Sequence, residues 1–157
     1  MLKHTKGNLL DLAEAGEFDI VVQGCNCFNT MGGGIAREIR ERYPNIAEAD
    51  AVTVKGDYNK LGNYTKGIVD ANNSHSFLII NAYTQFDMSK GTDVFEYNAF
   101  ALVLQKMERL YGTYSIGFPY IGMGLAGGKK EVIIPMIEYF AKSISAKGGS
   151  VTLVEFG

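Results

Sequence analysis

The sequence is poor in the residues that divide or cross-link a chain. Its 157 residues include no tryptophan, three prolines and two cysteines. With so few prolines there is no proline-rich linker, and we expect one domain over residues 1–157. Cys25 and Cys27 lie two positions apart where an expected strand ends, a spacing that favours neither a mutual disulfide nor a zinc site. We expect buried free thiols, which indicate a reducing compartment.

The chain also lacks an excess of charge and a long apolar run. Fifteen Lys and Arg residues oppose 17 Asp and Glu residues, for a net charge of -2. This balance gives no strong signal for a nucleic-acid partner, which usually needs a basic face. No apolar segment approaches membrane-spanning length, and the first residues form no hydrophobic signal region. We therefore expect a cytoplasmic protein without a membrane partner. His4 and His75 are expected at the surface.

Glycine, in contrast, is abundant. The 19 glycines are about 12% of the chain, against roughly 7% on average. Many of them lie in two segments, residues 31–36 and 117–128, and each segment connects an apolar strand to a helical pattern. Glycine lets backbone N–H groups approach a ligand, and helix N-termini favour anions. Two such loops in one small domain suggest a diphosphate that is held from both sides.

Strand and helix patterns alternate along most of the chain, which indicates an α/β fold. We expect strands at residues 2–6, 20–25, 64–71, 76–83, 114–119 and 150–156, with a hairpin turn at Asn72-Asn73-Ser74. Helices are expected at residues 9–15, 35–42 and 46–51. A further helix reaches residue 110, with Asp93 and Glu96 as a capping box, and a last one ends near residue 147. Pro135 must lie in the first turns of that last helix or kink it.

One local motif matches the glycine pattern of dinucleotide-binding proteins. Residues 122–127 match G-x-G-x-x-G between a strand and a helix, and Glu155 is a candidate ribose ligand. This leaves open an NAD(P)-binding Rossmann-type oxidoreductase. However, the motif lies too near the C-terminus for a second nucleotide-binding half, and the acid falls later than the usual ~20 residues. The motif also leaves the glycines at 32–34 unexplained.

Several segments taken together resemble the macrodomain family. The matching segments are Gly7-Asn8-Leu9, Cys25-Asn26, Met31-Gly32-Gly33-Gly34-Ile35-Ala36, Asn81-Ala82-Tyr83-Thr84-Gln85 and residues 121–127. They span nearly the whole chain in order. The sequence is most similar to the branch of yeast-type ADP-ribose 1''-phosphate phosphatases and terminal ADP-ribose glycohydrolases. The resemblance implies a three-layer α/β/α fold with a mixed central sheet, and ADP-ribose as the ligand, without a metal or a cofactor.

The resemblance also assigns ligand-binding residues. Asn8 would accept a hydrogen bond from the adenine amino group, and Phe156 would pack on the adenine face. Asn26 would bind the distal ribose, although asparagine also commonly stabilises turns by itself. The remaining expected ligand-binding residues are Leu9, Gly32, Gly33, Gly34, Ile35, Pro119, Gly122, Met123, Gly124 and Leu125.

The catalytic residues of the family are largely replaced. Ala126 stands where the glycohydrolases carry an aspartate, and Tyr83-Thr84-Gln85 lacks their lysine, which argues against removal of ADP-ribose from glutamate. Gln23 replaces the histidine of the phosphatases, and glutamine cannot accept a proton at neutral pH. Asn26, Gln23 and Thr84 remain as the candidate catalytic group, with Asp87 or a substrate phosphate oxygen as the base. We expect hydrolysis of ADP-ribose 1''-phosphate. The alternative is a non-catalytic reader or scavenger of ADP-ribose or of ADP-ribosylated macromolecules.

Overall fold

The computed structural model describes residues 1–71, 75–87, 94–124 and 126–157. Its strands and helices follow the alternating order expected from the sequence. The elements are β1 (Leu2–Gly7), α1 (Leu9–Glu14), β2 (Ile20–Cys25), α2 (Gly34–Arg42), α3 (Pro44–Ala51), the 3-10 turn η1 (Tyr58–Lys60), β3 (Tyr64–Ala71), β4 (His75–Tyr83), α4 (Tyr97–Tyr111), β5 (Ser115–Phe118), α5 (Lys130–Ala146) and β6 (Ser150–Phe156). The α/β prediction is confirmed.

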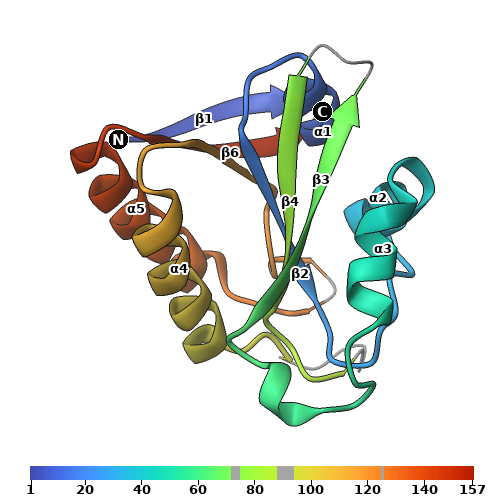
Figure 1. The fold of residues 1–157 in the computed structure, drawn as a ribbon. Helices are drawn as coiled ribbons and strands as arrows, with labels where there is room; N and C mark the ends of the chain where they lie inside the picture. The colour runs from blue at the N-terminus through green and yellow to red at the C-terminus, as the bar shows by residue number, and fades with distance from the viewer. Residues whose placement is uncertain (72–74, 88–93, 125) are drawn as a thin grey trace.

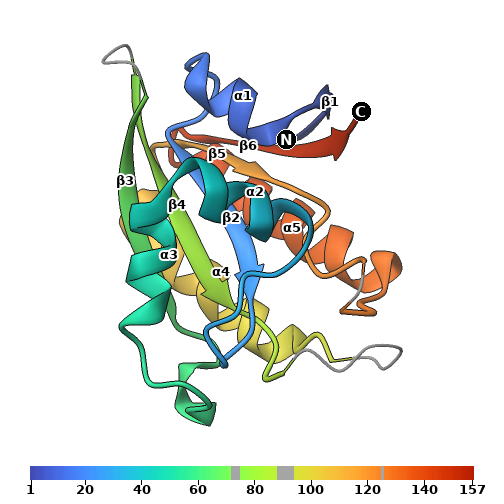
Figure 2. The ribbon, with the colours of Figure 1, turned by 90° about the vertical axis from the view of Figure 1, so that its right-hand side faces the viewer.

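The strands form one mixed sheet in the order β1-β6-β5-β2-β4-β3. All neighbours pair in parallel except β3, which runs antiparallel to β4. Helices α1, α2 and α3 cover one face of the sheet, and α4 and α5 cover the other. Figure 2 shows β1 and β6 side by side at one edge of the sheet and β3 at the opposite edge. The expected three-layer architecture with a mixed sheet is confirmed.

This topology overturns the Rossmann interpretation. A Rossmann sheet has the strand order 3-2-1-4-5-6 in two similar halves, and the order here is different. Glu155 is exposed at the end of β6 and pairs with Lys6 at 3.6 Å. The glycine motif at residues 122–127 therefore belongs to another fold.

Both faces of the sheet are buried, because successive side chains of a strand point to opposite sides. Along β2, Ile20 and Val22 join the apolar core under α4 and α5, whereas Val21 joins the core under α1, α2 and α3. Gln23 lies on the same face as Val21 and is fully buried. Its amide donates to Asn81 Oδ1 at 2.7 Å in the adjacent β4.

Some local expectations need correction. Helix α4 begins at Tyr97 with Glu96 as the residue before its first turn, so Glu96 is not the third residue of a capping box. His75 is half-buried at the start of β4 and hydrogen-bonds the Phe18 carbonyl at 2.8 Å, so it is not a surface residue in a turn. Pro135 lies inside α5, in its second turn. Asp93 and the turn at 72–74 lie outside the described residues.

The two glycine-rich loops leave neighbouring strands in opposite directions. After β2 the chain passes to α2 on one face of the sheet, and after β5 it passes to α5 on the other face. Such a divergence between adjacent parallel strands opens a crevice at their carboxyl ends, where open α/β sheets bind ligands. Strands β1, β4 and β6 also end at this edge, because they run in the same direction as β2 and β5.

Candidate functional site

A cavity of about 410 Å³ lies in this crevice, between the two glycine-rich loops. Its lining comes from the ends of β2, β4 and β5 and from the first turn of α2. In the part of the chain that the structure describes, no Asp, Glu, His, Lys or Arg lines it. Backbone groups and small polar side chains therefore set its chemistry.

The first loop contributes a helix N-terminus with open space around it. Gly33 precedes the first turn of α2, and a Cβ added at Gly32, Gly33 or Gly34 would meet no atom within 4 Å. Gly34 has a φ of +56°, which favours glycine. The N–H groups of the first helical residues have no acceptor within the helix. They and the helix dipole favour an anion in the cavity.

The second loop is fixed by its contact with Phe95 and by backbone hydrogen bonds. Gly122 has a φ of +74°, and a Cβ there would come within 2.3 Å of the Phe95 ring. Its carbonyl accepts the N–H of Gly128 at 2.7 Å, which closes the loop. The carbonyl of Ala126 accepts the N–H groups of both Val94 and Phe95. Gly122 and Gly124 line the cavity, so the loop presents backbone to it as the glycine pattern predicted.

Asn26 lies at the end of β2 and lines the cavity. It is 7% exposed, and its side chain also stabilises the turn that follows. Its oxygen accepts the Phe28 N–H at 2.8 Å, and its amide nitrogen donates to the Thr30 carbonyl at 3.2 Å and hydroxyl at 2.7 Å. Since an amide oxygen has two lone pairs, it retains one for a ligand hydroxyl.

Thr84 follows β4 directly and also lines the cavity. Its hydroxyl oxygen is buried and has no hydrogen-bond partner among the described residues. Buried polar atoms are nearly always paired, so an unpaired hydroxyl beside a cavity is a candidate ligand contact. A Cβ at Gly24 would lie only 2.9 Å from this oxygen, so a side chain at Gly24 would crowd the hydroxyl.

Gln23 is not brought to this cavity. Its side chain lies on the α3 side of the sheet, in a buried network with Asn81 and Thr65 from the next two strands. Asn81 Nδ2 donates to Thr65 at 3.1 Å and to the Ile46 carbonyl at 3.1 Å. Gln23 is not among the described residues that line the cavity. We therefore leave it out of the proposed reacting group.

Both cysteines are buried free thiols, as predicted. Cys25 lines the cavity, but burial raises the pKa of its thiol far above the usual range. Burial likewise raises the pKa of the Cys27 thiol. Because the thiolate is the reactive form, neither side chain is a nucleophile near neutral pH.

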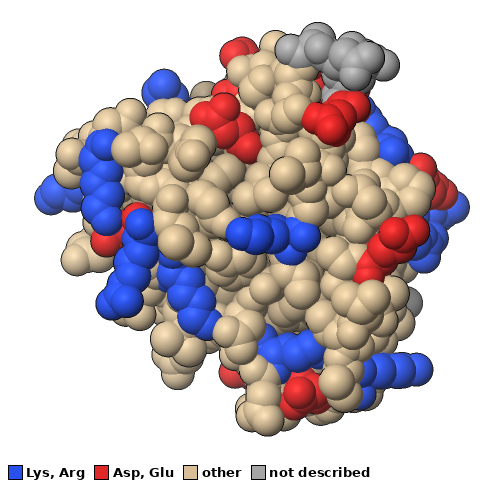
Figure 3. Space-filling view, viewed as in Figure 1, with Lys and Arg blue, Asp and Glu red and all other residues tan. Residues whose placement is uncertain are grey.

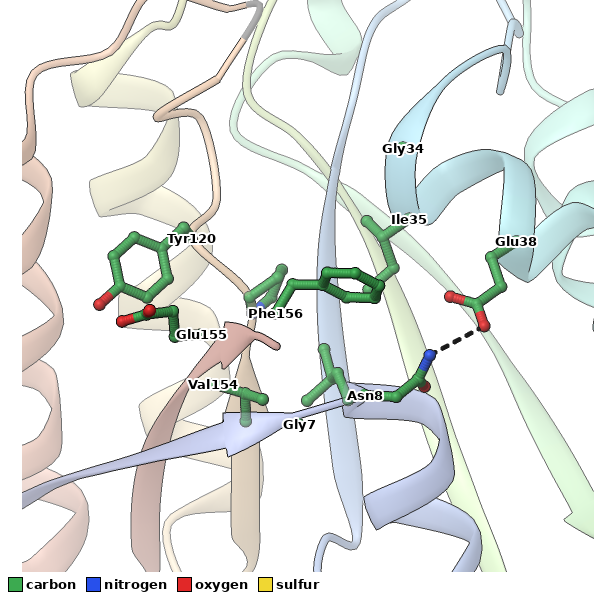
Figure 4. A pocket seen from close by; sticks show the side chains of 11 residues that line it. Gly7, Asn8, Gly34, Ile35, Glu38, Tyr120, Val154, Glu155 and Phe156 are labelled. Atoms are coloured by element: carbon green, nitrogen blue, oxygen red, sulfur yellow. Dashed lines mark hydrogen bonds between the residues drawn. The ribbon is translucent and has the colours of Figure 1, made fainter.

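A second cavity of about 640 Å³ adjoins the first. The two share Gly34, Ile35, Pro119 and Tyr120 in their linings. Figure 4 shows Phe156 and Ile35 facing each other across it. Leu9, which is buried, and Val154 add further apolar surface.

The polar rim of this second cavity holds Asn8 and Glu38. Asn8 is the residue before the first turn of α1, and its oxygen accepts the Asp11 N–H at 3.0 Å. Its amide nitrogen donates to Glu38 Oε2 at 3.1 Å (Figure 4). Arg42 donates to the same oxygen at 3.0 Å.

Some residues of this site were not predicted from the sequence. Glu38 and Tyr120 line the second cavity, and Tyr120 lines both. The sequence could have indicated Glu38, because it lies four residues after Gly34 and therefore one helical turn along the same face of the helix.

One expected ligand-binding residue within the described ranges, Met123, lines neither cavity. Met123 packs against the core under α4 and α5. Leu125 lies outside the described residues. The other expected ligand-binding residues all line one of the two cavities: Asn8, Leu9, Asn26, Gly32, Gly33, Gly34, Ile35, Pro119, Gly122, Gly124 and Phe156.

Charges elsewhere are dispersed. The face in Figure 3 carries separate basic and acidic side chains rather than one continuous basic surface. Within the described ranges, no helix is long and apolar enough to cross a membrane, and no group of three or more His, Cys, Asp or Glu side chains is arranged to hold a metal ion.

Comparison with known proteins agrees with this fold. A protein of Enterobacteria phage T4, described as an uncharacterized 17.5 kDa protein in the tk-vs intergenic region, is 30% identical over an alignment of 149 residues that covers 92% of each chain. The macrodomain of Mycobacterium tuberculosis DarG has a TM-score of 0.73 at 20% identity, covering 98% of this chain and 97% of that one. Thermosipho africanus DarTG in complex with ADP-ribose has a TM-score of 0.75 at 13% identity, covering 99% of this chain and 42% of that one. The model of the Macro domain family matches residues 22–137, and the chain belongs to that family.

Proposed function

We propose that this protein binds ADP-ribose in the crevice at the carboxyl ends of its parallel strands. The observation that carries the proposal is that two glycine-rich loops, from adjacent strands, line one cavity that adjoins a second, largely apolar one. The diphosphate lies between the loops, adenine occupies the apolar cavity, and the distal ribose lies near Asn26 and Thr84.

Electrostatics supports this orientation. The diphosphate is anionic, and the cavity between the loops has no charged side chain among its described lining residues. Backbone N–H groups and the N-terminus of α2 supply the positive potential there. The carboxylates of Glu38 and Glu155 lie at the other cavity, where an uncharged base avoids repulsion from them. The ADP-ribose complex of Thermosipho africanus DarTG, which shares this fold, is consistent with the choice of ligand.

Calorimetric titration of the protein with ADP-ribose and with AMP tests the proposal. ADP-ribose should bind at one site and raise the melting temperature, because a ligand of the native state stabilises it. AMP should bind more weakly, since it lacks the second phosphate and the distal ribose. Equal affinity for the two ligands would contradict binding across both cavities, and no binding of ADP-ribose would reject the proposed function.

Hydrolysis of ADP-ribose 1''-phosphate is a second candidate function, favoured by the unpaired hydroxyl of Thr84. In this reaction, the oxygen of a water molecule forms a bond to phosphorus while the bond between phosphorus and the ribose oxygen breaks. A phosphate oxygen of the substrate takes one proton of the water, because the described lining offers no general base, and this proton ends on the departing ribose oxygen. ADP-ribose and inorganic phosphate are the products. The hydroxyl of Thr84 would orient the water or the phosphate.

Phosphate release by wild type and Thr84→Val tests this second function. The hydroxyl is lost at nearly constant volume, so we expect release to slow by about fivefold to tenfold, as for the loss of roughly 1 kcal/mol of hydrogen bonding. Binding of ADP-ribose should change less than release. Thr113→Val, at an exposed position in the turn before β5, is the matched control. If wild type binds ADP-ribose but releases no phosphate, the protein is a binding module.

A further inference from the structure

Glu38 occupies an unusual position in the larger cavity. Its side chain is 35% exposed, and its Oε2 accepts from both Asn8 and Arg42. Its other oxygen, Oε1, has no hydrogen-bond partner among the described residues. Figure 4 shows that the carboxylate projects from α2 toward Phe156, with this second oxygen on the cavity side. One oxygen is therefore fixed by the protein, and the other is available to a ligand.

The orientation of Asn8 follows from its hydrogen bonds. The Asp11 N–H can only donate, so the oxygen of the Asn8 amide must face it. The amide nitrogen then faces Glu38. The oxygen of Asn8 thus already accepts a hydrogen bond from the N-terminus of α1, and Glu38 is the negatively charged acceptor that lies beside Asn8.

The guanidinium of Arg42 holds the carboxylate in place. Arg42 contacts Glu38 at 3.0 Å, Asp11 at 3.0 Å and Glu14 at 2.6 Å, and so joins α1 to α2. The side chain of Arg42 is itself 27% exposed. A carboxylate with two fixed donors on one oxygen is preorganised, because it does not need to become ordered when the ligand binds.

We propose that Glu38, fixed by Asn8 and Arg42, selects an amino-substituted base in this cavity. The inference rests on the proposed function and specifies which nucleotide diphosphate ribose the site accepts. Oε1 of Glu38 accepts the exocyclic amino group of adenine, and Asn8 presents an N–H donor beside it. Adenine offers a donor and an acceptor on neighbouring atoms, which complements this pair. Hypoxanthine has a carbonyl in place of the amino group, so its donor and acceptor positions are exchanged. It directs an oxygen toward the carboxylate of Glu38.

Titration of the wild-type protein with ADP-ribose and with its hypoxanthine analogue tests the inference without any variant. We expect ADP-ribose to bind at least about tenfold more tightly, because a mismatch at a charged acceptor leaves it unpaired. Equal affinity for the two would overturn the role of Glu38 and leave the proposed function intact. Failure to bind either ligand would overturn both.

Glu38→Gln provides a second test. Asn8 and Arg42 both donate, so the oxygen of the new amide must face them, and its NH₂ group must take the place of Oε1. A donor then replaces the acceptor. We expect affinity for ADP-ribose to fall about tenfold and affinity for the hypoxanthine analogue to rise, so that the preference is lost or inverted.

The matched control is Glu41→Gln on the same helix. Glu41 is exposed, pairs with Arg37 at 3.5 Å, and lines neither cavity. The Glu41→Gln variant removes the same charge without changing the base site, so the wild-type preference for ADP-ribose over its hypoxanthine analogue should remain. If Glu38→Gln kept that preference while folding normally, or if Glu41→Gln lost it equally, the assignment would be wrong.

Discussion

Substitution of Gly33 by glutamate places a negative charge between the two loops. Gly33 has φ -147° and ψ 162°, an extended conformation that any residue adopts, and a Cβ there meets no atom within 4 Å. The fold should therefore accept Gly33→Glu. Replacing the glycine before the first turn of α2 lowers the free energy of unfolding by about 0.5–1 kcal/mol. A carboxylate near a helix N-terminus raises it by about 0.3–1 kcal/mol. The free energy of unfolding should hardly change.

The effect on binding should be much larger. Two unit charges about 5 Å apart repel by about 1–3 kcal/mol for effective dielectric constants between roughly 80 and 20. For each phosphate charge this corresponds to a loss of roughly 5- to 150-fold in affinity. We expect Gly33→Ala to keep most of the affinity for ADP-ribose, because it adds a Cβ without a charge.

Calorimetry and circular dichroism measure the two effects separately. Gly33→Glu should lose most ADP-ribose binding and keep the native spectrum, whereas Gly33→Ala should keep both. Thr113→Glu adds the same charge at the opposite end of β5 and should bind normally. Normal binding by Gly33→Glu would refute the placement of the diphosphate beside α2. Equal losses in Gly33→Ala and Gly33→Glu would show that space rather than charge is limiting.

Two further predictions concern the carboxylates around α1 and α2. Asn8→Asp should weaken ADP-ribose binding severalfold in calorimetry, because the new carboxylate still caps α1 but faces Glu38 where an amide donor stood at 3.1 Å. Tighter binding by this variant would contradict the base-site geometry. Hydrogen bonds from Tyr43 and Arg42 lower the pKa of Glu14 despite its partial burial. Since the folded pKa lies below the unfolded value, of about 4.3, Glu14 contributes stability above that pH and loses the contribution as the pH falls further. The difference in urea midpoint between wild type and Glu14→Gln should therefore be largest near neutral pH and shrink in acid, and a constant difference would contradict it.

The sequence predicted the framework because its signals are local. Strand β2 begins and ends at the predicted residues, since its apolar run is bounded by Asp19 and by the turn at Asn26. Helix α2 stops before Pro44, which starts the next helix. The two glycine-rich loops each connect a strand to a helix, as expected. Propensity and turn chemistry are sufficient at these places, because no distant contact competes with them.

The orientation of Gln23 could not be predicted in the same way. Both faces of β2 are buried, so its apolar pattern does not show which helices cover which face. The choice depends on register, which pairs Gln23 with Asn81 and Asn81 with Thr65 across three strands. Those residues are up to 58 positions apart in the chain. The resemblance assigned Gln23 to the site because it stands at the histidine position of the phosphatases, but its side chain is buried against Asn81 and does not line the cavity.

The two cavities divide the recognition of one ligand between different kinds of group. Backbone donors face the phosphates, where side-chain charge would have to be desolvated on binding. The carboxylates lie at the base end, and there Arg42 neutralises part of the charge of Glu38 and keeps it in one position. Backbone N–H groups bind any diphosphate with the correct spacing, so they supply affinity with little selectivity for the nucleoside. Selectivity must then come from the base end, and Glu38 is the residue there that the helix geometry of α2 places within reach.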